Sequence, residues 1–301
     1  MLHEKLDLFR WVHEFPLTEL REEASSFVLQ RRKKLPKEYP DQRAVERHIN
    51  LMYPSGEIIV GPKSLAINHQ LREEAFEGTS YAGARAPTDV FVWGRGEPTM
   101  RCVTKVGGIP YWPADQPWPH GADGGPIRFI AQICFADSTD IIGSLPGEVL
   151  LILGDNDALL EPELLLFKWL PLGIDNVVME IPQKDQAGLL SPFYGVIHRT
   201  EDWPDAMNTL KVKYRYPQHI AVMEGAKIGG FPSWIQTEEL LPGRFLASLG
   251  TISVGDQQKW PFVNMPEPRQ RDDSDLHIGD MGSLYLFIDS QGIVNAVSQC
   301  Y

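Results

Sequence analysis

One stretch of eight residues occurs twice in this chain, and this repetition constrains its fold more than any other feature. Residues 105–112 read KVGGIPYW and residues 227–234 read KIGGFPSW, with five identities that include Gly-Gly, Pro and the rare Trp. Two further pairs follow in the same order: RFIAQI with RFLASL (128–133 and 244–249), and GEVLLILGD with GSLYLFIDS (147–155 and 282–290). Three ordered matches predict an internal duplication.

The residues within the repeated stretch predict two rigid corners. Adjacent glycines permit a positive φ and a close approach of the backbone, the following proline fixes its own φ, and the tryptophan anchors the turn. These structural positions are Gly107, Gly108, Pro110, Gly229, Gly230 and Pro232, with Trp112 and Trp234. We expect two lobes related by an approximate two-fold axis, with a groove between them.

The spacing of apolar residues and the frequency of Gly and Pro change near residue 90. Helical spacing of apolar residues predicts a helical N-terminal region over 1–89. Beyond it, short apolar runs punctuated by Gly and Pro predict mainly antiparallel strands, at DVFVW, EVLLIL, DNVVMEI and SLYLFI. The continuous apolar runs EVLLIL and ELLLF fit central strands buried on both faces, and periodicity does not separate this from a short buried helix. We therefore expect an α+β fold with β-rich repeats over 90–216 and 217–301, packed as one domain.

Composition excludes several classes of protein. The 301 residues carry a formal charge of −12, which argues against a nucleic-acid partner. The basic run at 31–34 is typical of a helix C-terminus, where cations complement the helix dipole. No apolar stretch is long enough for a membrane span, and three widely spaced cysteines without CxxC favour a reducing compartment. The prediction is a cytoplasmic protein without a cofactor or a cysteine-rich zinc site.

The motifs also resemble a known family. KVGGIPYWPADQPWP followed by PIRFIAQICF, then KIGGFPSWIQ and GDMGSLYLFI, resemble the YwqG-like proteins, a bacterial family without an established function. The resemblance covers about residues 90–301 and implies an α+β fold with internal duplication, but no reaction. Members of this family often carry His before the second Gly-Gly, where this chain has Ala226-Lys227. They also often carry a glutamine-containing stretch in the second half, where this chain reads FLASL.

Polar and aromatic residues near the repeated stretches are the candidate ligand-binding residues. Gln132 interrupts the apolar run RFIAQI, so it either ties down a neighbouring loop or faces a ligand; Gln236 is its candidate counterpart in the second copy. Trp118 opens the unusual stretch WPHGADGGP, in which His120 and Asp123 supply two potential metal ligands. Because a metal site needs three or four, we expect an exposed connection there and no metal.

Asp280 lies beside two glycines in HIGDMGSLYLF, and its counterpart in the first copy is Leu145. As a turn residue it needs no function, but an acid present in one copy alone hints at specialised use. His277 precedes it by three residues and is a candidate partner. An acid–base pair requires proximity and shifted pKa values, which a sequence does not reveal.

Two main hypotheses on function follow, and a structural module within a larger assembly is a third option. The first is a non-catalytic binding protein that recognises a protein or small ligand across the groove; a protein that neutralises a basic toxin is one version. The second is an enzyme of unrecognised type, with Gln132, His277 and Asp280 in a cleft. The chain lacks a GxSxG elbow, a Walker loop, HExxH and a dinucleotide fingerprint, which favours the first hypothesis.

Overall fold

The computed structural model describes residues 57–60, 72, 75–76, 81–98, 100–181, 189–206, 209–210, 221–252 and 275–301. Most of the region expected to be helical, 1–89, lies outside the described residues. Within it, 57–60 forms strand β1 (Glu57–Val60), and the first residues of strand β2 (Ala86–Arg95) precede residue 90. Arg72 and Ala75 are helical. The prediction of a helical N-terminal region is therefore not supported.

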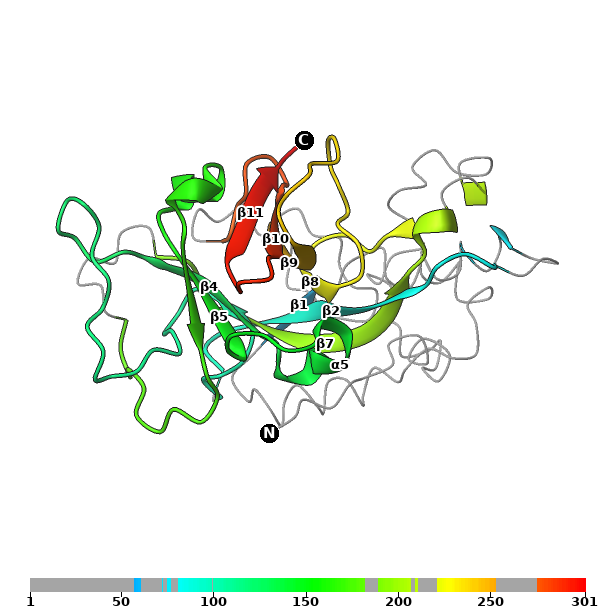
Figure 1. The fold of residues 1–301 in the computed structure, drawn as a ribbon. Coiled ribbons are helices and arrows are strands. Elements are labelled where there is room, and N and C mark those ends of the chain that lie inside the picture. The colour runs from blue at the N-terminus through cyan, green and yellow to red at the C-terminus, as the bar shows by residue number, and fades with distance from the viewer. Residues whose placement is uncertain are drawn as a thin grey trace.

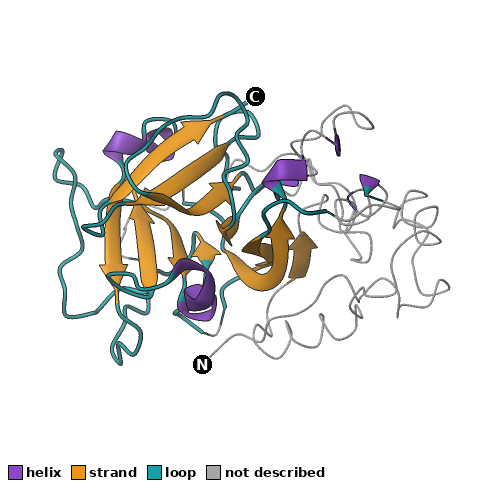
Figure 2. Cartoon of the chain, turned by 45° about the vertical axis from the view of Figure 1, so that its right-hand side comes forward, coloured by secondary structure: helices purple, strands orange, loops and turns teal. Residues whose placement is uncertain are grey.

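The described residues form a mainly antiparallel β fold with a few short helices (Figures 1 and 2). The remaining strands are β3 (Lys105–Val106), β4 (Phe129–Cys134), β5 (Val149–Leu153), β6 (Leu166–Leu170), β7 (Phe193–Asp202), β8 (Lys227–Gly229), β9 (Arg244–Gly250), β10 (Ser283–Ile288) and β11 (Val294–Gln299). The short helices that the structure describes are η2 (Ala136–Ser138), α5 (Thr139–Ile142), η3 (Asn156–Leu159), η4 (Pro162–Leu164) and η5 (Pro204–Ala206).

The strands belong to one sheet built outward from a central pair. The long strands β2 and β7 pair over their whole length, from Ala86 opposite Asp202 to Arg95 opposite Phe193. On the β7 side follow β3, β4, β5 and β6; on the β2 side follow β8, β9, β10 and β11, while β1 pairs with the end of β2. The series β3–β6, which follows β2 in the chain, therefore pairs with β7. The series β8–β11, which follows β7, pairs with β2.

The two series have the same register. Lys105 lies opposite Gln132 and Lys227 lies opposite Ser248, so each repeated stretch pairs in the same way with the strand that follows it. A β-bulge occurs at the same place in both: Ile130 is skipped where β4 meets β5, and Leu246 is skipped where β9 meets β10. Bulges change the local twist of a sheet, so both series bend at matching positions.

Strand β5 explains why a continuous apolar run suits this fold. Its five residues are completely buried, with Leu150 and Ile152 in one apolar cluster and Val149, Leu151 and Leu153 in another. Side chains alternate across a strand, so both faces of the sheet are covered here. Burial of each such side chain stabilises the fold by about 1.5–3 kcal/mol. The predicted strand over EVLLIL, buried on both faces, is confirmed.

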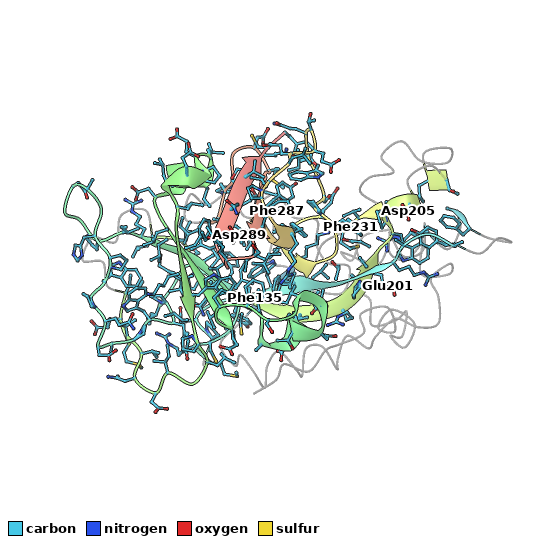
Figure 3. The ribbon with its side chains drawn as sticks, viewed as in Figure 1. Phe135, Glu201, Asp205, Phe231, Phe287 and Asp289 are labelled. Atoms are coloured by element: carbon cyan, nitrogen blue, oxygen red, sulfur yellow. The ribbon has the colours of Figure 1, made fainter. Side chains whose placement is uncertain are left out.

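The largest apolar cluster joins the two series of strands. It contains Ile130, Leu150 and Ile152 from the first series and Leu284 and Leu286 from the second. Side chains fill the space between β10–β11 and β4–β5 (Figure 3). The series thus share a core. A groove between them stays a prediction that these contacts do not support.

Two predicted strands differ from the structure. ELLLF is not a central strand, because 162–164 forms η4 and β6 is an edge strand, with Leu164 62% exposed. DNVVMEI forms no strand; Val177 makes a single bridge to Pro113 and, with Val178, packs on the second cluster. The apolar content of a run does not show whether other strands will pair with it. The structure differs from the prediction at both runs for this reason. Across the described residues, no helix has the length and apolar character needed to cross a membrane.

Candidate functional site

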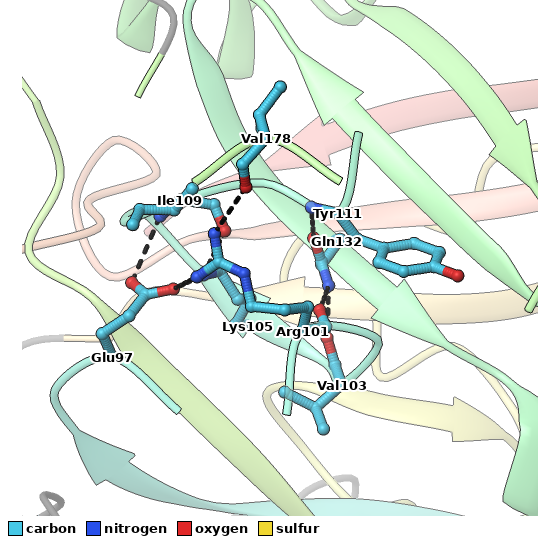
Figure 4. A network of polar contacts seen from close by, with 8 residues as sticks. All are labelled: Glu97, Arg101, Val103, Lys105, Ile109, Tyr111, Gln132 and Val178. Atoms are coloured by element: carbon cyan, nitrogen blue, oxygen red, sulfur yellow. Dashed lines mark hydrogen bonds and ion pairs between the residues drawn. The ribbon is translucent and has the colours of Figure 1, made fainter. Parts of the chain in front are cut away.

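The first Gly-Gly corner closes around a carboxylate (Figure 4). Gly107 and Gly108 have φ values of +59° and +67°, which brings the loop back toward Glu97, two residues beyond the end of β2. Lys105 Nζ donates to Glu97 Oε1 and to the carbonyl of Ile109, while the amide of Ile109 donates to Glu97 Oε2 over 3.2 Å. A side chain at Gly108 would clash with Glu97. The corner therefore already holds an internal anion.

Arg101 extends this network. Its guanidinium donates to Glu97 Oε1 over 2.8 Å and to the carbonyl of Val178 over 3.0 Å. Glu97 is 29% exposed and Lys105 is completely buried, so water reaches the carboxylate but not the ammonium group. Arg101 thus links the first corner to residues 175–181, the DNVVMEI segment.

The second corner has the same arrangement with a shorter acid. Gly229 and Gly230 have φ values of +72° and +69°. Lys227 Nζ donates to Asp202 Oδ2 over 2.7 Å, and the amide of Phe231 donates to the same oxygen over 2.9 Å. The amide of Met223 donates to Asp202 Oδ1 over 2.7 Å. Asp202 is the last residue of β7, as Glu97 closely follows β2.

Sequence reasoning missed both acids. The signal that could have found them is the lysine at the start of each repeated stretch, because a lysine in an apolar setting needs a partner when it is buried. The acids themselves, Glu97 and Asp202, lie outside the repeated stretches and are not the same residue type. Only the folded chain brings them to Lys105 and Lys227.

Burial lowers the pKa of both lysines. Removal from water disfavours the charged form and lowers the pKa of Lys105 to about 8, although Glu97 partly opposes this shift. Burial likewise lowers the pKa of Lys227, against the attraction of Asp202. A lysine with a lowered pKa is a potential nucleophile, but neither side chain has any exposed surface for a substrate to approach. We assign both lysines to loop anchoring.

Gln132 is also engaged inside the protein. Its Nε2 donates to the carbonyls of Arg101 and Val103, each over 2.7 Å, and its Oε1 accepts from the amide of Tyr111 over 2.8 Å. Both N–H bonds of the amide are therefore used, which leaves no donor for a ligand. Gln132 ties down the loops around the first corner.

Gln299, at the end of β11, does the comparable work in the second half. Its Oε1 accepts from the amides of Ile235 and Gln236, and its Nε2 donates to the carbonyl of Thr237 and to Glu239. Gln236, the predicted counterpart of Gln132, is exposed and donates to the carbonyl of Cys300 over 2.6 Å. Gln299, and not Gln236, therefore ties down the loop beside the second corner. Strand pairing between β10 and β11 brings Gln299 to this loop, although it lies outside the repeated stretches.

The candidate tryptophans pack as anchors. Trp112 and Trp118 meet edge to face, with ring centroids 5.0 Å apart, and each donates its indole N–H to a backbone carbonyl. Trp234 packs on Tyr285 and Phe287 at 4.8 and 6.0 Å. These contacts fix the loops that follow Pro110 and Pro232.

The stretch from Trp118 to Pro126 folds back on itself. His120 pairs with Pro126 in an isolated bridge, and its Nδ1 lies 2.8 Å from the carbonyl of Trp118. Asp123 Oδ1 accepts from the amide of Gly125 over 2.9 Å, which is turn chemistry. No cluster of His, Cys, Asp and Glu suited to a metal ion occurs in the described part of the chain.

Asp280 and Gln236 both border the end of the chain that follows β11. The amide of Tyr301 donates to the carbonyl of Asp280 over 3.1 Å, next to the carbonyl of Cys300 that accepts from Gln236. Asp280 is exposed and His277 is half-buried. Gln132, by contrast, makes its contacts around the first corner.

A surface around β11 is the second candidate site, and we call it the acidic face. It comprises segments 155–165, 231–243 and 275–301, which contain nine Asp or Glu and no Lys or Arg. They meet through the Ser298 hydroxyl, which donates to the carbonyl of Leu159, and through the contacts of Gln299 and Gln236. In Figure 1, the green helical turns η3 and η4, the yellow 231–243 loop and the C-terminus lie along the upper side.

Comparison with known families matches the first corner and its surroundings. Residues 104–153 match a domain of unknown function, DUF1963. The DUF1963 match spans β3, β4 and β5 and includes Lys105, Gly107, Gly108 and Gln132. It does not reach Glu97 or the second corner, and it brings no reaction with it. Among curated proteins, none matches the chain.

Proposed function

We propose that this chain is a non-catalytic binding protein that recognises a basic protein through the acidic face. The observation that carries the proposal is the charge of that face: its three segments contain nine Asp or Glu, of which Asp275 is buried, and no Lys or Arg. Six of its carboxylates are exposed, namely Asp155, Glu161, Glu163, Glu238, Glu239 and Asp280. Arg128, from outside these segments, lies 3.5 Å from Asp155. Such a field attracts cationic partners and speeds their association.

Exposed apolar side chains support the same proposal. Nine large hydrophobic residues are exposed in the described chain, and seven of them lie in these three segments. The seven are Leu160, Leu164, Phe231, Leu240, Met281, Ile293 and Tyr301. Leu160 lies beside Gly279, and the amide of Tyr301 bonds to Asp280, so Leu160, Met281 and Tyr301 lie close together. Ile293 lies at the opposite end of β10 and β11. Apolar residues gathered with exposed carboxylates are typical of protein interaction sites, because single exposed hydrophobics are otherwise scattered.

Backbone strain occurs on the same face. Met281 has a φ of +55°, and it is the single non-glycine residue with a positive φ in the described part of the chain. It follows Asp280 and is 39% exposed. A bulky residue in this conformation costs free energy, and such strain collects at functional sites.

The polar groups of the repeated corners favour a binding protein over an enzyme. Lys105, Lys227, Glu97, Asp202 and Gln132 all bond to other parts of the chain. The alternative, an enzyme with Gln132, His277 and Asp280 in a cleft, stays a proposal. The saturated amide of Gln132 weighs against it.

We also propose that residues 86–170 and 193–299 arose by duplication. The matched registers, the matched bulges and the two lysine–carboxylate corners support this. The boundary between the copies then falls between β6 and β7, ahead of the boundary at residue 216 that the repeats suggest. Together with the DUF1963 match, this arrangement supports the YwqG-like family as the wider relationship. A cytoplasmic protein that neutralises a basic partner is one concrete version of the proposed function.

Site-specific photo-crosslinking tests the proposal in cells that contain this protein. A benzophenone amino acid replaces Leu160 or Tyr301 on the acidic face, and replaces Met179, which is 74% exposed outside it, in the control. We expect crosslinks to one basic protein from the first two positions and not from Met179. The purified pair should dissociate as salt is raised, since exposed charges are screened.

Three results would overturn the proposed function. These are crosslinks of equal yield from Met179, a partner without net positive charge, and no crosslink from either position on the acidic face. Turnover of a small molecule by the purified chain, lost when Asp280 is replaced by Asn, would favour the enzyme instead.

A further inference from the structure

Leu240 is the most exposed large apolar side chain of the described residues, at 97%. It follows Glu238 and Glu239 near the tip of the 231–243 loop, which rises beside the C-terminus in Figure 1. Exposure of a leucine is common on flexible loops. This loop, however, is held at many points.

Gln299 fixes the approach to Leu240. All of its amide positions are used on residues 235–239: two backbone N–H groups donate to its Oε1, and its Nε2 donates to a carbonyl and to the Glu239 carboxylate. Gln299 itself is only 4% exposed and sits at the end of a regular strand. The part of the loop that precedes Leu240 is therefore pinned to the sheet.

Further contacts hold both ends of the loop. At its start, the hydroxyl of Tyr285 donates to the carbonyl of Ser233, and Trp234 packs on Phe287. At its end, Asn295 Nδ2 donates to the carbonyl of Pro242 over 3.3 Å. The loop has lost its conformational freedom, yet Leu240 has buried almost none of its surface. A preorganised group of this kind gains affinity on binding, because the entropy of ordering the loop is already lost.

We propose that Leu240 is the apolar anchor for a basic polypeptide segment, against which an apolar side chain of that segment packs while its Lys and Arg side chains meet the surrounding carboxylates. This inference rests on the proposed function and adds the point of contact. The charge of the occupant follows from the chemistry of the loop, since 231–243 has two glutamates and no cation. Glu238 lies two residues before Leu240, and Asp280 lies next to the C-terminal residues that contact Gln236. Both carboxylates are exposed and supply the steering charge.

The test uses the full chain and a phage-displayed library of twelve-residue peptides. Selected peptides are synthesised, and their binding to the wild-type chain and to variants is measured by fluorescence anisotropy at two salt concentrations. We expect peptides rich in Lys and Arg that also contain a large apolar residue. Leu240→Ala should weaken their binding at least about tenfold, and the matched control Met179→Ala should change it less than about twofold.

Two variants test preorganisation without altering Leu240. Gln299→Leu removes the four side-chain hydrogen bonds that hold residues 235–239. Gln236→Ala removes one hydrogen bond, from the Gln236 side chain to the Cys300 carbonyl, and because Gln236 is exposed this change should not affect folding. We expect weaker binding from both, with the larger loss for Gln299→Leu if it folds. Unchanged affinity in Gln236→Ala and in a folded Gln299→Leu would contradict the role of these hydrogen bonds.

The remaining outcomes separate this inference from the proposed function. Basic peptides whose binding is unaffected by Leu240→Ala, but is lost in Glu161→Lys or Asp280→Lys, would overturn the anchor and leave the acidic face intact. Selection of peptides without excess positive charge, or of none, would overturn both.

Discussion

Lys227 Nζ lies 2.7 Å from Asp202 Oδ2, and neither side chain has any exposed surface. An ion pair removed from water in this way is stable only while both partners are present, because a single buried charge loses its hydration without compensation. The pair joins the end of β7 to the second Gly-Gly corner.

Breaking this pair should destabilise the fold strongly. Lys227→Met leaves Asp202 buried beside two backbone donors and should lower the free energy of unfolding by about 3–5 kcal/mol. The control is Arg128→Met, since Arg128 pairs with Asp155 on the surface, where a loss below about 1 kcal/mol is expected. Urea denaturation measures both, and similar losses would show that burial does not set the strength of the pair.

The stability of the protein should depend on pH through Lys105. Burial lowers the pKa of Lys105 from 10.5 to about 8, so between these pH values the unfolded chain binds a proton that the folded chain has released. Its contribution to the free energy of unfolding therefore rises with pH across this window and is least favourable below pH 8. Lys105→Met should reduce that rise and leave only the part due to the lowered pKa of Lys227, whereas Lys168→Met, on an exposed side chain, should keep all of it. Parallel curves for wild type and Lys105→Met would contradict the lowered pKa.

A glycine at position 230 should be required for two reasons. Its φ of +69° is unfavourable for other residues, and a Cβ there would clash with Thr88 Oγ1 and Asp202 Oδ2. Gly143 has a similar φ of +66°, but a Cβ would meet nothing within 4 Å. The ψ of Gly143 is −157°, a combination that is nearly exclusive to glycine, so Gly143→Ala should cost about 1–3 kcal/mol from the backbone alone. Gly230→Ala should cost more, because a steric clash is added to the backbone strain. Equal thermal unfolding temperatures for the two variants would refute the close packing at the corner.

Gln132 should be needed for stability and not for contact with a ligand. Gln132→Glu places a carboxylate against the carbonyls of Arg101 and Val103, which lose their donors, at a cost of about 2–4 kcal/mol. Because Gln236 is exposed, Gln236→Glu should cost less than about 1 kcal/mol. Chemical denaturation at neutral pH compares them. A stable Gln132→Glu protein with altered ligand binding would instead support the enzyme hypothesis.

Local patterns of the sequence determined several elements of this protein. The apolar runs at 148–153 and 283–288 contain β5 and β10, and the two Gly-Gly stretches adopt the positive φ values that glycine permits. These features follow from residues close together in the chain, where side-chain alternation and backbone sterics act directly. The same reasoning failed at ELLLF, because an edge strand and a central strand can have the same apolar content.

Only the tertiary structure decided what the corners hold and which surface is charged. Glu97 and Asp202 reach their lysines, and Gln299 reaches the 231–243 loop across about sixty residues, because strand pairing brings distant segments together. The acidic face arises in the same way, from three segments that are unremarkable when each is considered alone. Long-range pairing depends on the whole sheet, and for this reason local sequence patterns did not reveal it.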